Sequence, residues 1–182
     1  CSSTLNDSRA GDDGGAICWN GDDGAIYNIT CNNNTGICHG DSNSRGGTIS
    51  LTGNNVNINK SSITSGRVVY SAGSDSSKID GGAMFITGDN IIISDTNFTD
   101  CTASNDGGAI YALGNNVEII NSIFTNNEVT EDGGALYISG ENCKICSSTL
   151  NDSRAGDDGG AIYWEGANGI IEGCDFTENK GL

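Results

Sequence analysis

The cysteines are the first residues of this chain whose spacing could do chemistry. Cys143 and Cys146 are separated by two residues, as in redox-active and zinc-binding C-x-x-C motifs. The sequence has no second motif of this kind and its one histidine is His39, so a set of four zinc ligands is hard to assemble. A buried thiol, or a cystine with a neighbouring segment, explains the motif better than a reactive pair.

Pairs of aspartates recur beside glycines. Their carboxylates, together with nearby carbonyls, could supply the oxygen ligands that Ca²⁺ prefers. Asp-Gly sequences also form tight turns without any ligand. We therefore expect turns and no cofactor, with calcium as the one candidate metal and these aspartates as its ligands: Asp12, Asp13, Asp157 and Asp158.

An aromatic residue recurs at one position that alternates with apolar residues: Phe85, Tyr111, Tyr137 and Tyr163. In a strand, this alternation places the rings on the outer face of a sheet. Rings at equivalent positions of neighbouring strands can stack and stabilise the sheet. They can also form a binding platform for sugar rings or another protein. Both roles stay open at this point.

The composition argues against several classes of protein. The formal net charge is −16, so we expect neither nucleic acid nor an anionic membrane surface as a partner, because both require basic surfaces. No stretch approaches the roughly 18 apolar residues of a membrane span, so no membrane insertion is expected in this segment. Six N-x-S/T sequons fit an extracellular protein with N-glycans: Asn6, Asn28, Asn33, Asn59, Asn97 and Asn151.

A repeat organises the chain. Gly-Gly followed by a small and an aliphatic residue begins at six positions: Gly14, Gly46, Gly81, Gly107, Gly133 and Gly159. The last three intervals are 26 residues, whereas the first two are 32 and 35, which indicates irregular insertions near residues 32–45 and 66–80. On a larger scale, residues 1–37 match residues 146–182, so five short units form a super-repeat of 145 residues.

Each unit contains short apolar runs bounded by Gly, Asn, Asp and Ser, which is typical of strands. Three apolar columns recur once per unit, and one unit supplies Ile110, Ile119 and Phe124 to them. We predict an all-β fold, a single-stranded parallel β-helix of about six to seven coils, three-sided, with about 26 residues per coil. Residues 1–182 should form one continuous β-helix, and the absence of proline agrees with strands that are paired on both edges.

Two sets of side chains should connect neighbouring coils. Asparagines at one turn should hydrogen-bond along the stack and adopt a left-handed backbone, because asparagine tolerates that conformation. Cys146 and Cys174 fall on adjacent coils, and we predict a disulfide between them.

The units resemble the repeats of polymorphic outer-membrane proteins, which are marked by Gly-Gly-Ala-aliphatic and Phe-x-x-Asn. The first motif occurs at five positions with Gly46-Gly-Thr-Ile as a departure, and the second at Phe124–Asn127 and Phe176–Asn179. Similar repeats occur in adhesin-like surface proteins of methanogenic archaea. The resemblance implies a secreted, surface-displayed β-helix used for attachment, with no catalytic residues to carry over.

We therefore expect a non-catalytic structural and adhesive segment of an extracellular cell-surface protein, a rigid rod that displays its loops. One alternative is a filament subunit that associates end to end with copies of itself, because strand edges at the ends favour pairing. A second alternative is a β-helix that binds or cleaves host or plant polysaccharide. An enzyme is not expected, since the basic residues are few and Lys60 and Asp95 are explained by a stacked ion pair.

Overall fold

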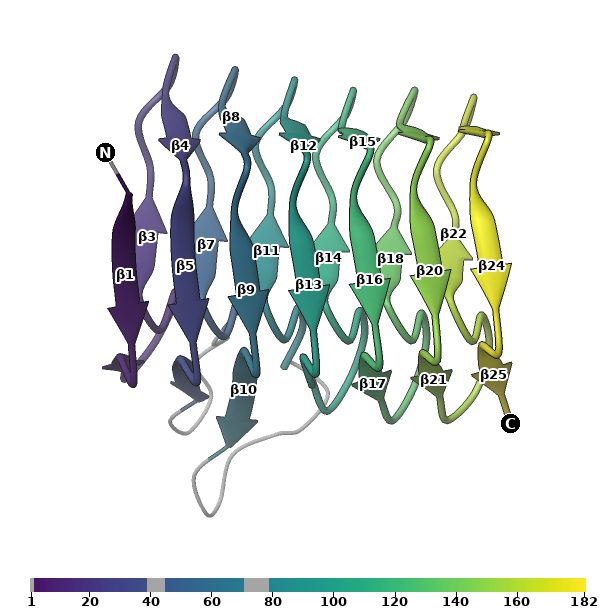
Figure 1. Ribbon diagram of the computed structural model, residues 1–182, viewed down its shortest axis with the longest axis horizontal. Coiled ribbons are helices and arrows are strands. Elements are labelled where there is room, and N and C mark those ends of the chain that lie inside the picture. Colours follow the sequence, from purple (N-terminus) through teal and green to yellow (C-terminus); the bar gives the residue numbers. More distant parts are fainter. Residues whose placement is uncertain (1, 39–44, 71–78) are drawn as a thin grey trace.

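The computed structural model of the chain describes residues 2–38, 45–70 and 79–182. These residues form strands joined by turns and bends, and among them there is no helix that could cross a membrane. Every strand pairs in parallel with the equivalent strand of the next coil, so the coils stack into a rod with the two termini at opposite ends (Figure 1). The predicted all-β parallel β-helix is confirmed.

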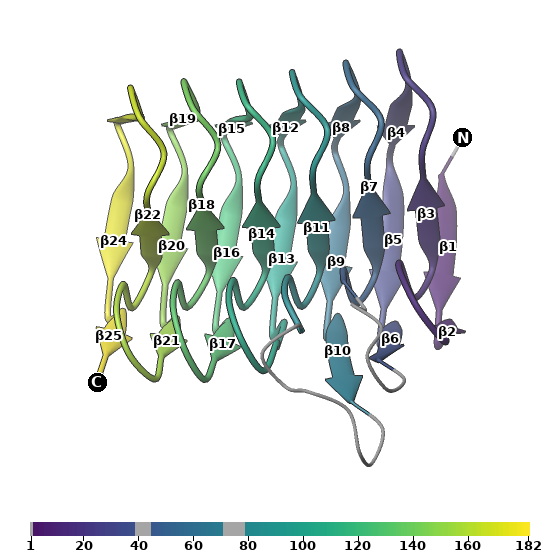
Figure 2. The ribbon, with the colours of Figure 1, turned by 180° about the vertical axis from the view of Figure 1, so that it is seen from behind.

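Three long sheets run along the rod, one for each predicted apolar column. The front sheet of Figure 1 contains β1 (Ser3–Asn6), β5 (Ile29–Asn32), β9 (Ser62–Thr64), β13 (Asn97–Thr99), β16 (Ile123–Thr125), β20 (Thr149–Asn151) and β24 (Asp175–Thr177). The rear sheet, which faces the viewer in Figure 2, contains β3 (Ile17–Trp19), β7 (Ile49–Leu51), β11 (Met84–Ile86), β14 (Ile110–Ala112), β18 (Leu136–Ile138) and β22 (Ile162–Trp164). The upper sheet contains β4 (Ala25–Tyr27), β8 (Asn57–Asn59), β12 (Ile92–Ser94), β15 (Glu118–Ile120), β19 (Lys144–Cys146) and β23 (Ile170–Glu172).

A fourth row of short strands, the lower row, closes each coil beneath the three sheets (Figure 1). Thr102 bridges its two halves by pairing with Arg67 on one side and Glu128 on the other. Four of its six strands have only two residues, and the two longer ones lie in segments expected to be insertions, so the sequence pattern indicated only three sides. The row contains β2 (Arg9–Ala10), β6 (Thr35–Cys38), β10 (Arg67–Tyr70), β17 (Glu128–Val129), β21 (Arg154–Ala155) and β25 (Lys180–Gly181).

The two insertions expected near residues 32–45 and 66–80 contain β6 and β10 of this row, so part of each forms regular strand. Residues 39–44 and 71–78, which make up much of them, lie outside the described residues.

The core is a set of like-on-like stacks inside the coil. Ile93, Ile119 and Ile145 occupy one position of three successive coils and are at most 1% exposed. The rings of Phe98 and Phe124 stack with their centroids 4.8 Å apart. In-register pairing places each side chain on its equivalent in the next coil, so the core repeats with the coil and buries apolar surface at every step.

Asparagines form the ladder that the sequence predicts at the turn between the rear and upper sheets. Asn55, Asn90 and Asn116 have left-handed φ angles of 55–58°. The Nδ2 of Asn90 donates to Oδ1 of Asn55 at 3.0 Å, and Asn116 donates to Asn90 at 2.9 Å. A left-handed backbone costs an ordinary residue about 1 kcal/mol, which explains why asparagine or aspartate recurs there.

The Gly-Gly motif is required by close backbone contacts at the corner before the rear sheet. Gly107 has a φ of 65°, and a Cβ there would lie 2.4 Å from the carbonyl oxygen of Ile110. A Cβ on Gly108 would lie 2.1 Å from the carbonyl oxygen of Gly134 in the next coil. The first glycine therefore makes the turn and the second lets successive coils approach.

The asparagine of Phe-x-x-Asn satisfies a buried corner between the front sheet and the lower row. Asn127 is 0% exposed, and its Oδ1 accepts the backbone N–H of Cys101 at 3.0 Å. Its Nδ2 donates to the carbonyl oxygen of Phe98 at 3.2 Å. Asn34 and Asn179 make the equivalent pairs of bonds to their preceding coils. The motif thus supplies partners for backbone groups that the turn leaves without a strand neighbour.

We predict that Asn127→Ala lowers the free energy of unfolding by between about 2 and 5 kcal/mol, because it leaves one buried N–H and one buried C=O without partners. Chemical denaturation followed by circular dichroism measures the change. The exposed Asn115→Ala is the control and should change the free energy by less than about 1 kcal/mol. Equal losses in both variants would contradict the role assigned to Asn127.

Candidate functional site

The outer face of the rear sheet carries the predicted column of aromatic rings. The ring centroids are 5.7 Å apart for Phe85 and Tyr111, 4.6 Å for Tyr111 and Tyr137, and 5.0 Å for Tyr137 and Tyr163. The planes differ by 11–23°, so each ring lies nearly face to face on the next. We call this column the aromatic ladder.

The aromatic ladder offers little ring surface to a ligand. Phe85 is 4% exposed and Tyr137 is 9% exposed. The guanidinium of Arg45 lies over the Phe85 ring, 4.7 Å from its centroid, and the Tyr137 hydroxyl donates to Glu165 at 2.9 Å. A sugar stacks on the face of an aromatic ring, and most of these faces are already occupied by the neighbouring ring. The geometry favours sheet stabilisation over a sugar platform.

A column of charged residues, the corner column, runs beside the aromatic ladder at the residue before each Gly-Gly. It contains Asp13, Arg45, Asp80, Asp106, Asp132 and Asp158. Each coil is tied to the next here, since Asp132 donates its backbone N–H to Oδ1 of Asp106 at 3.2 Å, and Asp158 donates to Asp132 at 2.9 Å.

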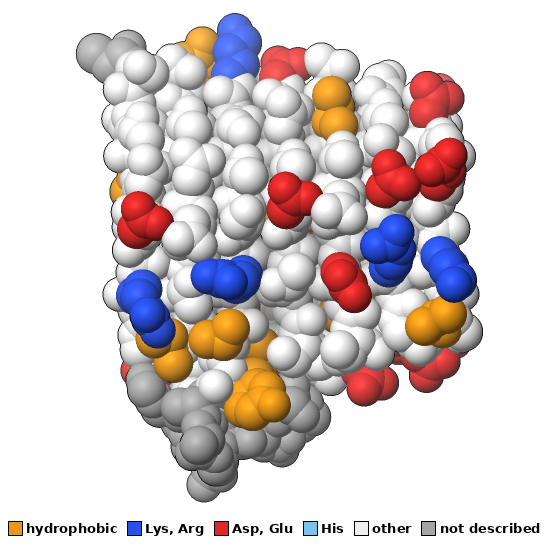
Figure 3. Space-filling view, turned by 60° about the horizontal axis from the view of Figure 1, so that its bottom comes forward, with side chains coloured by type: hydrophobic (Ala, Val, Ile, Leu, Met, Phe, Trp, Pro, Cys, Tyr) orange, Lys and Arg blue, Asp and Glu red, His pale blue; other side chains and the backbone are white. Residues whose placement is uncertain are grey.

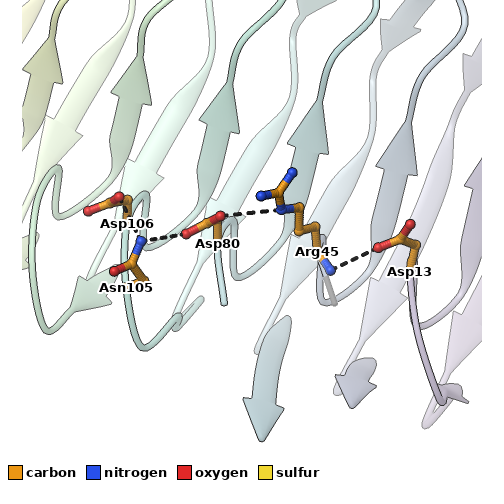
Figure 4. Close-up of polar contacts among 5 residues, drawn as sticks. All are labelled: Asp13, Arg45, Asp80, Asn105 and Asp106. Carbon is orange, nitrogen blue, oxygen red and sulfur yellow. Dashed lines mark hydrogen bonds and ion pairs between the residues drawn. The ribbon is translucent and has the colours of Figure 1, made fainter. Parts of the chain in front are cut away.

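Arg45 neutralises part of the corner column (Figure 4). Its Nε lies 3.5 Å from Oδ2 of Asp80, whose side chain is only 3% exposed, and its backbone N–H donates to Asp13 at 3.0 Å. On the other side, Asn105 donates to Asp80 and to Asp106, both at 2.8 Å. Asp80 is therefore buried among a cation, an amide donor and a second carboxylate.

Burial raises the pKa of three of these carboxyl groups, those of Asp13, Asp80 and Asp106. The pKa of Asp106 rises to about 6, chiefly through burial and further through the charges of Asp80, Asp132 and Glu131. Burial likewise raises the pKa of Tyr111 to about 12, so its hydroxyl keeps its proton at neutral pH.

The predicted disulfide between Cys146 and Cys174 is not formed, and both are free thiols. Alternation along β19 turns Ile145 inward and Cys146 outward, beside Lys144. Cys174 instead packs against the core, with its Sγ 3.6 Å from the carbonyl oxygen of Ile145. Cys143 is a buried thiol, and burial raises its pKa.

The aspartates considered for calcium lie at the same corner. Asp13 and Asp158 belong to the corner column, and Asp12 and Asp157 precede them as exposed residues. In the part of the chain that the structure describes, no group of three or more His, Cys, Asp or Glu side chains is placed to hold a metal ion. Calcium binding at these aspartates stays a prediction.

The six sequon asparagines lie on the outside of the rod or near it. Asn6, Asn33 and Asn97 are exposed, and the other three, Asn28, Asn59 and Asn151, are half-buried. Several of their amides hydrogen-bond to a neighbouring coil, as at Asn6, Asn59 and Asn151. Glycosylation at these positions stays a prediction.

Lys60 and Asp95 do not form the expected ion pair. The Nζ of Lys60 lies 3.4 Å from the Tyr27 hydroxyl and 5.6 Å from the centroid of its ring. Asp95 accepts a hydrogen bond from Asn121 of the next coil. Both residues have left-handed backbones at the same corner, with φ of 50° and 49°, but each side chain contacts a different coil: Lys60 the preceding one and Asp95 the following one.

Sequence reasoning missed a line of basic side chains on the lower row. Arg9, Arg67, Arg154 and Lys180 share one outward position and are exposed. They are four of the 8 lysines and arginines in the chain. Aligning the units at the residue four places after the third apolar column would have revealed them.

Residues 121–139 match the Chlamydia polymorphic membrane protein repeat. The chain carries a polymorphic membrane protein repeat. The matched residues contain both motifs, Phe124–Asn127 and Gly133–Leu136, and they span a corner of the coil from β16 to β18. This match supports a surface or outer-membrane protein. No curated protein and no solved structure shows significant similarity to the chain.

We predict that Asp106→Asn stabilises the protein at pH 7 to 8 by about 1–2 kcal/mol. Folding raises the pKa of Asp106 from 3.8 to about 6, so the folded state binds protons more tightly than the unfolded state. The stability of the native protein should therefore fall as pH rises from about 4 to about 6, and then level off. The figure allows for solvent screening of this half-buried group.

Denaturation curves between pH 3 and pH 8 measure this difference. The advantage of Asp106→Asn over the native chain should become small near pH 4 and vanish near pH 3, where both the folded and the unfolded state carry the proton. Asp157→Asn, which removes an exposed carboxylate, is the matched control and should not reproduce the pH dependence. A constant difference at all pH values would count against the titration of Asp106.

Proposed function

We propose that this chain is a non-catalytic, rigid repeat segment of a cell-surface protein, which holds its outer faces and loops away from the surface for attachment. The observation that carries the proposal is the uninterrupted stacking of equivalent strands, including a seven-stranded front sheet. The match to the polymorphic membrane protein repeat supports the surface location.

Rigidity follows from the way the coils are joined. Each coil donates and accepts backbone hydrogen bonds along three sheets and the lower row. Asparagine, aspartate and aromatic side chains add further bonds and contacts at the corners and on the rear face. Bending the rod would require breaking several of these contacts within one coil at once, so a stiff, elongated molecule is expected.

The surroundings of the charged groups support a non-catalytic role. Asp80 and Arg45 are paired with each other, and Asp106 is held by Asn105. Hydrolysis of a glycosidic bond needs two carboxyl groups on either side of a substrate. In the corner column the carboxylates instead accept hydrogen bonds from backbone N–H groups of the next coil. An end-to-end filament and an archaeal source remain predictions from the sequence.

The super-repeat allows a test of whether the stacked coils form a rigid rod. Residues 1–37 match residues 146–182, so a fusion of residues 1–145 to the N-terminus of the full chain continues every column in register. We expect this fusion to fold and to lengthen the rod by about 24 Å, the height of five coils at a strand spacing of about 4.8 Å. Small-angle X-ray scattering measures the length and cross-section.

A fusion of residues 1–132 is the control, because it ends half a coil short of the full period. It should disrupt the columns at the junction and give a bent or partly unfolded particle. Beads coated with the longer rod should attach to a target surface at a greater distance than beads coated with the native chain. A fusion that leaves the length unchanged, or release of sugar fragments from polysaccharides by the native chain, would overturn the proposal.

A further inference from the structure

One residue of each coil in the lower row lies on a line along the rod; Thr35 is buried, Thr102 is half-buried and the others are exposed. Pairing in register connects these seven residues in order: Arg9, Thr35, Arg67, Thr102, Glu128, Arg154 and Lys180. The neighbouring inward residues, such as Val68, Val129 and Ala155, are buried. Figure 3 shows this side, with blue basic side chains in a line across it and red acidic side chains beside them.

The cations of this line are not neutralised by ion pairs. Within the residues that the structure describes, the ion pairs involve Arg45 with Asp80 and Lys144 with Glu172. Arg67 donates to the neutral Oδ1 of Asn33 at 3.1 Å. The cations of the line are therefore available for an anionic ligand, although the molecule as a whole carries a charge of −16.

A groove of about 280 Å³ accompanies the last part of the line. Arg154, Lys180 and Glu128 contribute polar side chains to it, and the exposed Leu182 contributes apolar surface, whereas Val129 and Ala155 also line it but are at most 3% exposed. Cations bind carboxylates, a carboxylate accepts hydrogen bonds from hydroxyl groups, and an apolar side chain contacts the C–H face of a sugar. The groove therefore offers a partner for each kind of group that a sugar acid presents.

We propose that the lower row binds a linear acidic polysaccharide that carries carboxylates and hydroxyl groups. Arg154 and Lys180 bind carboxylates, Glu128 accepts hydrogen bonds from hydroxyls, and Arg9 and Arg67 hold the chain further along the rod. This inference rests on the proposed attachment role and names the class of ligand for it. It uses different residues from the aromatic ladder.

The charges beside the line favour a ligand that carries hydroxyl groups as well as carboxylates. Carboxylates flank the row at Asp7, Asp100, Asp152 and Glu178, and Glu128 interrupts it. Along a polyphosphate or a DNA backbone there are charged phosphates but no hydroxyl groups that could donate hydrogen bonds to these carboxylates. A polysaccharide with hydroxyl groups between its carboxylates can instead donate hydrogen bonds to them.

Binding of polygalacturonate, a linear carboxylated polysaccharide, tests the proposal by isothermal titration calorimetry. The native chain should bind it at 0.05 M NaCl and more weakly at 0.5 M NaCl, because salt screens exposed charges. Fully methyl-esterified polygalacturonate, which keeps the sugar backbone and lacks the charge, should bind at least tenfold more weakly. A single-stranded oligonucleotide of equal length should also bind at least tenfold more weakly than polygalacturonate.

The variant Arg154→Ala/Lys180→Ala should reduce affinity for polygalacturonate at least tenfold. Lys60→Ala/Lys144→Ala removes the same charge from elsewhere on the rod and should change affinity less than twofold. Equal losses in the two variants, no binding by the native chain, or tighter binding of the oligonucleotide would each overturn the inference. The fusion of residues 1–145 tests the rod independently, so a rod of the expected length without polygalacturonate binding would refute only this inference.

Discussion

In-register hydrogen bonding between parallel coils is the interaction on which the rest of this structure depends. Strands such as β13 and β14 use their backbone groups to bind the coils before and after them. An insertion within the paired part of a coil would move the equivalent residues out of line, whereas the longer first two units keep them in register. The column residues therefore keep their positions across the coils, and the additional residues of the two longer units fall between paired strands in the sequence, after β6 and β10.

The corners are where this constraint is hardest to satisfy, because the chain turns there and leaves the strand pairing. Glycine removes the Cβ that would collide with the next coil at Gly108. Asn127 replaces the missing strand partners with its own amide. The two motifs of the polymorphic membrane protein repeat thus serve the same purpose, which is to let the backbone turn without losing contact with the next coil.

The outer faces have more freedom, and they differ from one another in chemistry. Stacked rings, whose faces are largely covered, line the rear sheet beside the corner column of carboxylates. Among the described residues, the lower row presents cations outside any ion pair, the carboxylate of Glu128 and a groove. Like residues on the rear face reinforce the stack, whereas the mixed residues of the lower row make a surface that can recognise a ligand.

The sequence alone determined the coil and its inward columns. Ile119 and Phe124 recur with the unit, and their repeat predicts which strands stack. It also predicted the asparagine ladder, since only a few residue types tolerate the left-handed turn at Asn90.

Only the tertiary structure decided which outward groups come together and how far they are covered. The lower row escaped prediction because four of its strands have only two residues and the other two lie in segments expected to be insertions, so the line from Arg9 to Lys180 was not apparent. The directions of the Cys146 and Cys174 side chains depend on the twist of the strands and on the neighbouring corners. The burial of Tyr137 depends on the same features. Repetition in the sequence fixes the contacts between equivalent residues, whereas contacts between different columns are set by the geometry of the folded coil.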